Sequence, residues 1–283
     1  MLTRFQNSWE LVKASARVLW ADKELIIFPI FSGIGVLVVS LSFFLPFLFT
    51  NMIDTIFTGG TQLFGLIVLF VFYIVQYTII FFANTALVGA AIIRLRGGDP
   101  TVGDGFRIAF SRFAVILGYA LIAATVGMIM NALSRRSKGI GRMLISLIGF
   151  AWNVATYLVV PVLAMEGVGP IEAIKRSVKL LKQTWGEQII GNFGLGAVFG
   201  LATFGIIIVM IPLIALAINF QSFLLIAGLI LLLIITLTII GLVQSTLEGI
   251  YRAAVYQYAT TGQAGAFFDE AMVRNAFSAQ KPF

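Results

Sequence analysis

Five long stretches of the chain contain no Asp, Glu, Lys or Arg: residues 25–53, 55–93, 113–134, 143–165 and 188–247. A helix that crosses the apolar core of a bilayer, about 30 Å thick, needs roughly 20 predominantly apolar residues, and each stretch reaches that length. Hydrophobic residues make up 60% of the chain and charged residues 11%, which is more apolar surface than a soluble fold can bury. The pattern therefore predicts an integral, all-α membrane protein.

The last charge-free stretch is long enough for two crossings. It contains Pro212 and then the polar residues Asn219, Gln221 and Ser222, which favour a turn between two helices. We therefore expect six crossings in a single domain, residues 1–283. The predicted membrane helices are residues 25–49, 63–93, 113–133, 143–165, 189–216 and 223–247, and residues 248–283 are expected to form a cytoplasmic tail.

The distribution of basic residues predicts the orientation of these helices. Six crossings put both termini on one side, and all but four of the 19 basic residues fall on that side, which the positive-inside rule assigns to the cytoplasm. The exceptions are Arg135, Arg136, Lys138 and Arg142, in a short loop between the third and fourth helices. The first helix does not have the pattern of a secretory signal and organellar targeting features are absent, so we expect a prokaryotic inner membrane.

Three segments on the predicted cytoplasmic side have the periodicity of amphipathic helices. One covers residues 2–22. A shorter one, residues 99–113, begins at Asp99 as a candidate N-cap. The third covers residues 170–185, and its apolar stripe consists of Ile171, Ile174, Val178, Leu181 and Trp185.

Basic amphipathic helices suit the interface between lipid and water. Each Lys or Arg near an anionic membrane surface contributes about 1 kcal/mol to binding, and Trp is typical of the interface. The residues expected to contact anionic lipid headgroups are Lys175, Arg176, Lys179, Lys182, Lys13 and Arg17, and the expected interfacial anchors are Trp9, Trp20 and Trp185. The alternative is that these helices only brace the bundle and set the tilt of the membrane helices.

Glycines in the fifth membrane helix indicate close packing. Gly196 and Gly200 form a pair of small residues four positions apart, which allows two helix backbones to approach closely in lipid. The partner helix could belong to the same chain or to another subunit of a homo-oligomer.

Residue types exclude most catalytic chemistry. The chain has no His and no Cys, so Ser-His and Cys-His catalysis and thiolate or imidazole metal sites are ruled out. The glycine-rich segment 94–106 lacks the Lys-Ser/Thr pair of a P-loop and the oxygen ligands of a calcium loop. We expect no enzymatic activity, no metal, no cofactor and no nucleic-acid partner.

Polar side chains within the predicted spans are few. They are Gln76, Asn84, Asn131, Asn153, Thr156, Asn192 and Gln244. None is ionisable, which argues against ion-coupled transport. Glu248 and Arg252, one helical turn apart after the last predicted span, are expected to form an ordinary interfacial ion pair.

Two segments carry a resemblance to a known family. The sequence VVPVLAMEGVGPIEAIKRSVKLLKQTWGE, with YRAAVYQYATTG near the end, resembles bacterial and archaeal six-helix membrane proteins related to the membrane domain found beside some glycerophosphodiester phosphodiesterases. Many of these are domains of unknown function. The likeness is concentrated at Glu166, Gly167, Pro170, Ala173, Ser177, Trp185, Tyr258 and Gly262. The resemblance implies six helices and a cytoplasmic amphipathic helix, but no phosphodiesterase activity, because the soluble catalytic domain and its His residues are missing.

The expected role is therefore structural or membrane-organising, with anionic lipid contacts and possible self-association. A passive transporter or channel, or a lipid transporter, is the runner-up. It is favoured by a weak similarity between the two ends of the chain, each an amphipathic helix followed by two crossings, because internal repeats are common in transporters. An enzyme would be limited to carboxylate or hydroxyl chemistry.

Overall fold

The computed structural model describes residues 2–49, 62–185 and 194–274. Within these ranges the chain is helical and has no strand. The same ranges contain six helical segments long and apolar enough to cross a membrane, which are Lys23–Leu45, Leu63–Leu95, Phe113–Arg136, Ile140–Glu166, Val198–Asn219 and Phe223–Thr261. The predicted fold class is confirmed, and the chain is a multi-pass, all-α membrane protein.

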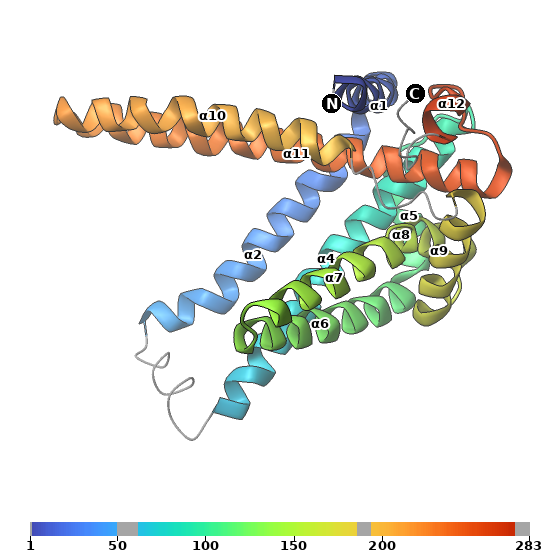
Figure 1. Ribbon diagram of the computed structural model, residues 1–283, viewed down its shortest axis with the longest axis horizontal. Helices are drawn as coiled ribbons and strands as arrows, with labels where there is room; N and C mark the ends of the chain where they lie inside the picture. Colours follow the sequence, from blue (N-terminus) through green and yellow to red (C-terminus); the bar gives the residue numbers. More distant parts are fainter. Residues whose placement is uncertain (1, 50–61, 186–193, 275–283) are drawn as a thin grey trace.

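The long helices form three antiparallel pairs that fan out from one end of the molecule (Figure 1). The pairs are α2 (Ile27–Phe49) with α4 (Gln62–Leu95), α6 (Phe113–Arg136) with α7 (Ile140–Ala155), and α10 (Gly194–Asn219) with α11 (Phe223–Thr261). The α10–α11 pair points away from the other two. Much of the lateral surface of each pair is therefore left to contact lipid or another subunit.

Short helices gather where the three pairs meet (Figure 1). They are α1 (Leu2–Ala21), the 3₁₀ turn η1 (Lys23–Ile26), α5 (Val102–Ser111), α8 (Val159–Glu166), α9 (Pro170–Trp185) and α12 (Glu270–Arg274). α1 packs against α10 and α11, whereas α9 packs against α8 and α11. These short helices hold the diverging pairs together.

The tightly packed core lies at this junction. Its fully buried side chains include Leu87 and Ile92 of α4, Leu163 of α8 and Ile250 of α11. Gly249 lets α11 approach α4, because a Cβ there would collide with Leu87. Away from the junction the helices expose large apolar side chains, as expected where lipid replaces a protein core.

The last helix is longer than predicted. The sixth predicted span ends at residue 247, but α11 continues to Thr261, so residues 248–261, predicted as the start of the cytoplasmic tail, are helical. No Gly or Pro interrupts the segment between Gly249 and Gly262, and Gly262 ends the helix with a left-handed conformation at φ 75°. The remaining tail, residues 275–283, lies outside the described residues.

The fourth predicted span is broken, which the sequence pattern did not indicate. α7 ends at Ala155 and α8 begins at Val159. Pro161 has no N–H to donate to the carbonyl group of Tyr157, which removes a helical hydrogen bond at the break. The Leu158 N–H instead donates to Ser177 Oγ of α9, at 3.1 Å.

The fifth helix also differs in detail from the prediction. α10 continues through Pro212, which was expected to help interrupt the last apolar stretch, and the turn falls at residues 220–222 as the polar cluster indicated. Its predicted first residues, 189–193, lie outside the described residues.

Candidate functional site at the charged end

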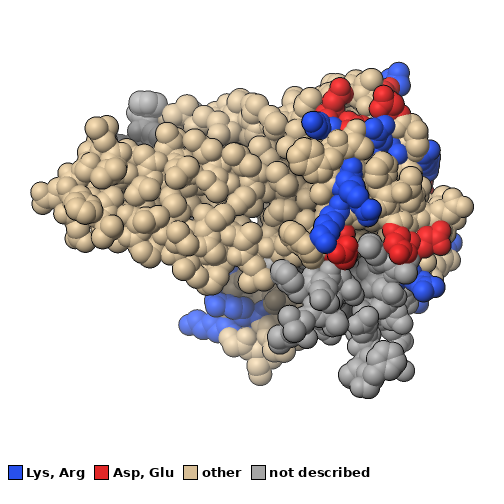
Figure 2. Space-filling model, turned by 90° about the horizontal axis from the view of Figure 1, so that it is seen from above, with Lys and Arg blue, Asp and Glu red and all other residues tan. Residues whose placement is uncertain are grey.

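Charged residues are concentrated where the three helix pairs meet. Figure 2 shows Lys, Arg, Asp and Glu side chains gathered at this end, here called the charged end, while the surface toward the opposite end is mostly uncharged. A separate basic group of four exposed residues lies at the α6–α7 turn: Arg135, Arg136, Lys138 and Arg142. This segregation is the one expected for a protein whose middle is embedded in lipid.

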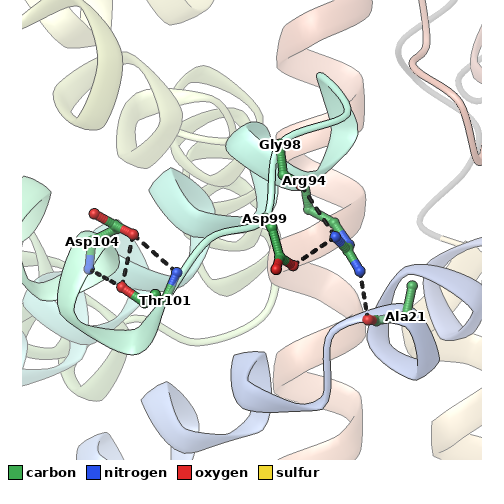
Figure 3. Close-up of polar contacts among 6 residues, drawn as sticks. All are labelled: Ala21, Arg94, Gly98, Asp99, Thr101 and Asp104. Carbon is green, nitrogen blue, oxygen red and sulfur yellow. Dashed lines mark hydrogen bonds and ion pairs between the residues drawn. The ribbon is translucent and has the colours of Figure 1, made fainter.

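Arg94 joins three elements at the charged end (Figure 3). Its guanidinium donates to the Ala21 carbonyl oxygen at the end of α1, at 2.6 Å, and to Asp99 Oδ1, at 2.9 Å. It also donates to the Gly98 carbonyl oxygen at 3.2 Å. Burial raises the pKa of the neighbouring Asp22 carboxyl, an effect that the charge of Arg94 opposes. Arg94 is therefore a structural link between α1, α4 and the loop before α5.

The glycine-rich loop ends in a helix cap, as predicted, but the prediction of the capping residue was wrong. Thr101, not Asp99, is the N-cap of α5: its hydroxyl accepts from the Asp104 N–H, and the Asp104 carboxylate accepts from the Thr101 N–H (Figure 3). Asp99 is engaged by Arg94 instead. The Thr101 N–H holds the pKa of Asp104 below its usual range. Among the described residues, no group of three or more Asp and Glu could hold a metal ion.

Glu166 connects α8, α9 and α11. Both of its carboxylate oxygens accept from Arg176 Nε, at 3.1 and 3.0 Å, and Oε1 also accepts from the Tyr256 hydroxyl at 3.1 Å. Gly167 follows with φ 64°, and the Arg112 guanidinium occupies the space that a Cβ would need there. The ion pair between Glu166 and Arg176 thus fixes the position of α9.

The six predicted headgroup residues divide into two groups. Arg176 is held by Glu166, and Arg17 donates to the Phe267 carbonyl oxygen at 3.1 Å, so both brace the charged end. Lys13 and Lys175 form exposed pairs with Glu10, at 2.8 Å, and Glu172, at 4.0 Å. Exposed pairs of this kind add little stability. Lys179 and Lys182 are exposed and pair with no carboxylate of the described residues.

The apolar stripe predicted for α9 coincides only in part with the face of the helix that is buried. The buried face consists of Ala173, Ser177, Leu180 and Leu181. Ile171 and Val178, expected on that stripe, are 63% and 43% exposed, because α8 and α11 cover the helix from a different side. On a helical projection both residues lie beside Lys175, Lys179 and Lys182, and together they form what we call the α9 outer stripe.

The structure describes the side chains of two of the three predicted aromatic anchors. Trp20 is 74% exposed, with Lys23 Nζ lying 5.7 Å from the centre of its ring, and Trp9 is also exposed. The backbone of Trp185 ends α9, while its side chain lies outside the described residues. Exposed Trp beside Lys is typical of the membrane interface.

The predicted packing glycines make no close contact within the described part of the chain. A Cβ added at Gly196 or Gly200 would meet no described atom within 4 Å. Packing of this face against another helix of the described chain is therefore not observed. Packing between subunits stays a prediction.

One feature was missed by the sequence analysis. A cavity of about 610 Å³ lies between α4, α6, α7, α10 and α11, and Glu248 and Arg252 line it together with the mid-span residues Asn153 and Thr156. The prediction placed both charged residues after the last span, and their expected ion pair has Arg252 Nη2 and Glu248 Oε2 3.7 Å apart. The uninterrupted helical sequence up to Gly262 is the signal that could have shown that they belong to the bundle.

Comparison with known proteins identifies a family but no activity. A family model described as "Family of unknown function (DUF6159)" matches residues 63–267, which include five of the six membrane spans and α9. A search of curated proteins finds no match to the chain.

Proposed function

The chain belongs to the family of unknown function DUF6159, so its role is inferred from its own residues: we propose that it is a non-enzymatic, membrane-organising protein that contacts anionic lipid headgroups through its charged end. The observation that carries the proposal is the α9 outer stripe, where Ile171 and Val178 are exposed beside three exposed lysines. Nothing within the described chain covers this stripe.

The chemistry of the α9 outer stripe favours a lipid surface. Exposed Ile and Val side chains can insert at the boundary between headgroups and acyl chains, while neighbouring Lys ammonium groups reach the phosphates. Three such charges contribute about 3 kcal/mol before screening by salt, at about 1 kcal/mol each. Exposed Trp9 and Trp20 on the same end of the molecule support the same placement.

Basic residues and the family resemblance support a location. The charged end holds both described ends of the chain and most of the basic residues, so we place it in the cytoplasm of a prokaryotic cell, with the protein in the inner membrane. The resemblance to the membrane domain beside glycerophosphodiester phosphodiesterases supports the same setting. That domain is attached to an enzyme and is not itself the catalytic unit.

The absence of catalytic activity is part of the proposal. The chain has no His and no Cys. Several carboxylates at the charged end have structural partners, since Glu166 binds Arg176 and Tyr256, and Glu24 accepts from the Val102 N–H at 3.1 Å. These groups are occupied in holding helices together.

The proposal is tested by neutralising the α9 outer stripe. The triple variant Lys175→Gln, Lys179→Gln, Lys182→Gln leaves Arg176 and its bond to Glu166 intact. We expect it to purify with a lower ratio of anionic to zwitterionic lipid than the wild type, by a factor of about three or more, measured by mass spectrometry of extracted lipid. The three lysines together contribute about 3 kcal/mol to the free energy of headgroup binding, and screening by salt reduces this contribution.

The matched control carries the same change at the opposite end of the molecule, Arg135→Gln, Arg136→Gln, Lys138→Gln. This control should keep the wild-type ratio of anionic to zwitterionic lipid. Its monodispersity and melting temperature should equal those of the α9 variant. An unchanged lipid ratio in the folded α9 variant would leave these helices only a bracing role and remove the proposed headgroup contact.

Self-association is the second part of the proposal. Gly196 and Gly200 are exposed in the described chain, Gly196 at the edge of the cavity and Gly200 one helical turn farther along α10. Small residues at such positions allow another helix to approach closely. Membrane organisation by one small protein also benefits from assembly of several copies. We therefore propose that the part of α10 that carries Gly196 and Gly200 contacts a second copy of the chain.

A lipid transporter is the second candidate function. The cavity between α4, α6, α7, α10 and α11 favours it, because a carrier needs a site inside the bundle. A headgroup-accessible lipid translocation assay with the protein in liposomes tests this candidate. Transport above that of empty liposomes would promote it over the organising role.

A further inference from the structure

The cavity has its charged side chains at one end and mostly apolar side chains at the other. On α6, Tyr119 lies about 9 Å from Phe113 along the helix axis and Met130 about 26 Å, by the 1.5 Å rise per residue. The part toward the charged end is lined by Thr156, Tyr157, Glu248 and Arg252. Ala123, Val126 and Met130 line the part toward the membrane interior, together with Tyr77, whose hydroxyl lies 3.4 Å from the position of a Cβ at Gly127. Such a gradient matches a molecule with a polar head and an apolar tail.

The polar wall holds one positive and one negative group. Arg252 and Glu248 are the only charged residues among those described as lining the cavity, so its net charge is zero. Arg252 Nη2 and Glu248 Oε2 are 3.7 Å apart, well beyond the 2.7–2.9 Å of a charge-assisted hydrogen bond. Both side chains are about one-third exposed, at 35% and 31%, so each can reach a ligand.

Neighbouring side chains hold the two charges in place. Gln244 Nε2 donates to Glu248 Oε1 at 2.9 Å, one turn back along α11. The guanidinium carbon of Arg252 lies 5.4 Å from the centre of the Tyr157 ring, a cation–π arrangement. The positions of the positive and negative groups are therefore set before any ligand enters.

A buried hydroxyl supports a polar ligand. Tyr251 lines the cavity, and only 5% of the residue is exposed. Its hydroxyl oxygen is itself buried and has no hydrogen-bond partner among the described residues. A buried hydroxyl without a partner costs roughly 1–3 kcal/mol, and a ligand removes this cost when the Tyr251 side chain turns its hydroxyl toward the cavity and forms a hydrogen bond with it.

We propose that this cavity binds the zwitterionic headgroup of a phospholipid, with the phosphate at Arg252, the ammonium at Glu248 and the start of the acyl chains along the apolar wall. An anionic ligand would be repelled by the Glu248 carboxylate, and a cationic ligand would be repelled by the Arg252 guanidinium. A zwitterionic ligand can pair with both charges. The volume of about 610 Å³ is within the range of small-molecule sites.

The site is distinct from the α9 outer stripe, and the inference goes beyond the function proposed above. Binding is measured by isothermal titration calorimetry on the purified full chain in an uncharged detergent. The probes are dihexanoyl phosphatidylethanolamine, dihexanoyl phosphatidylglycerol and glycerophosphoethanolamine without acyl chains. Wild type should bind the zwitterionic lipid about tenfold more tightly than the anionic one.

Two charge variants should shift the preference in different ways. Arg252→Gln removes the phosphate contact and should weaken binding of both lipids about tenfold. Glu248→Gln should weaken phosphatidylethanolamine binding but strengthen phosphatidylglycerol binding, since Arg252 is then unbalanced. A purely structural ion pair would not produce this reversal. Matched controls are Glu172→Gln and Arg135→Gln, exposed residues away from the cavity, which should leave both affinities unchanged.

The inference would be overturned by equal binding of the two lipids to the wild type or by unchanged affinities in both folded charge variants. It would also be overturned by loss of binding in the α9 triple variant, which would assign the binding to the outer stripe. If a charge variant does not fold, Tyr251→Phe replaces it and should weaken zwitterionic binding about threefold. If glycerophosphoethanolamine binds as tightly as the lipid, the ligand of this site is a soluble zwitterion, and the proposal of a phospholipid ligand is wrong.

Discussion

Gly105 lies where α5 packs closely against α2 and α4 at the charged end. A Cβ at this position would collide with the Phe28 ring and lie 2.9 Å from the Ala86 carbonyl oxygen, so α5 has no room for a side chain against α2 and α4. We expect Gly105→Ala to lower the free energy of unfolding by about 1–3 kcal/mol, as overpacking of a core does. Thermal unfolding in detergent measures the effect.

The same helix provides the control. A Cβ at Gly103 would have Thr101 Oγ1, at 3.6 Å, as its nearest neighbour, an ordinary van der Waals distance. Gly103→Ala should therefore leave the free energy of unfolding unchanged or raise it by up to about 1 kcal/mol, because Ala favours a helix. Equal losses in the two variants would contradict the packing of α5 seen here.

Individual residues also show what the sequence pattern can and cannot predict. The loop after α4 contains both Asp99 and Thr101, and either can cap a helix. Asp99 is drawn to Arg94, a contact that depends on the position of α1, so Thr101 becomes the cap. Tertiary contacts decide between capping residues that local sequence leaves equivalent.

At the level of elements, charge-free length predicted the membrane helices correctly. All six were found, because a long apolar run has few other stable conformations in lipid. Their ends were less accurate. α11 extends past Leu247 because the charged residues after it do not interrupt a helix. α7 gives way to α8 near Pro161, which cannot donate a backbone hydrogen bond, and the Leu158 N–H at the break donates to Ser177 Oγ of α9.

α10 carries a test of self-association. Gly200→Leu should leave the melting temperature of the monomer close to that of wild type, since no described atom lies within 4 Å of an added Cβ. It should abolish a dimer or higher oligomer measured by light scattering of the detergent-solubilised protein, because a Leu side chain blocks close helix approach.

Gly241→Leu provides the comparison on α11, where a Cβ also meets no described atom within 4 Å. This variant should keep the oligomer. Wild-type assembly in both variants would show that the glycine-bearing face of α10 points to lipid, and a lower melting temperature in Gly200→Leu alone would place its partner helix within the chain.

For the whole molecule, the arrangement of the three helix pairs is the part that the sequence could not predict. Composition and the positive-inside rule establish crossings and an expected orientation, but the cavity depends on where α4, α6, α7, α10 and α11 meet. The α9 outer stripe has the same origin, since α8 and α11 determine which side of α9 is covered. Periodicity indicates an amphipathic helix without indicating which neighbour covers its apolar side.

The depth of α9 in the bilayer tests the account most directly. A fluorophore attached through Val178→Cys can be placed specifically, because the natural chain has no Cys. In nanodiscs with anionic lipid, we expect quenching of this fluorophore by lipids brominated near the headgroup and little quenching by aqueous iodide. Quenching by the lipids should fall when Lys175, Lys179 and Lys182 are changed to Gln. A fluorophore quenched by iodide alone, in both backgrounds, would contradict the proposed contact between the charged end and the membrane.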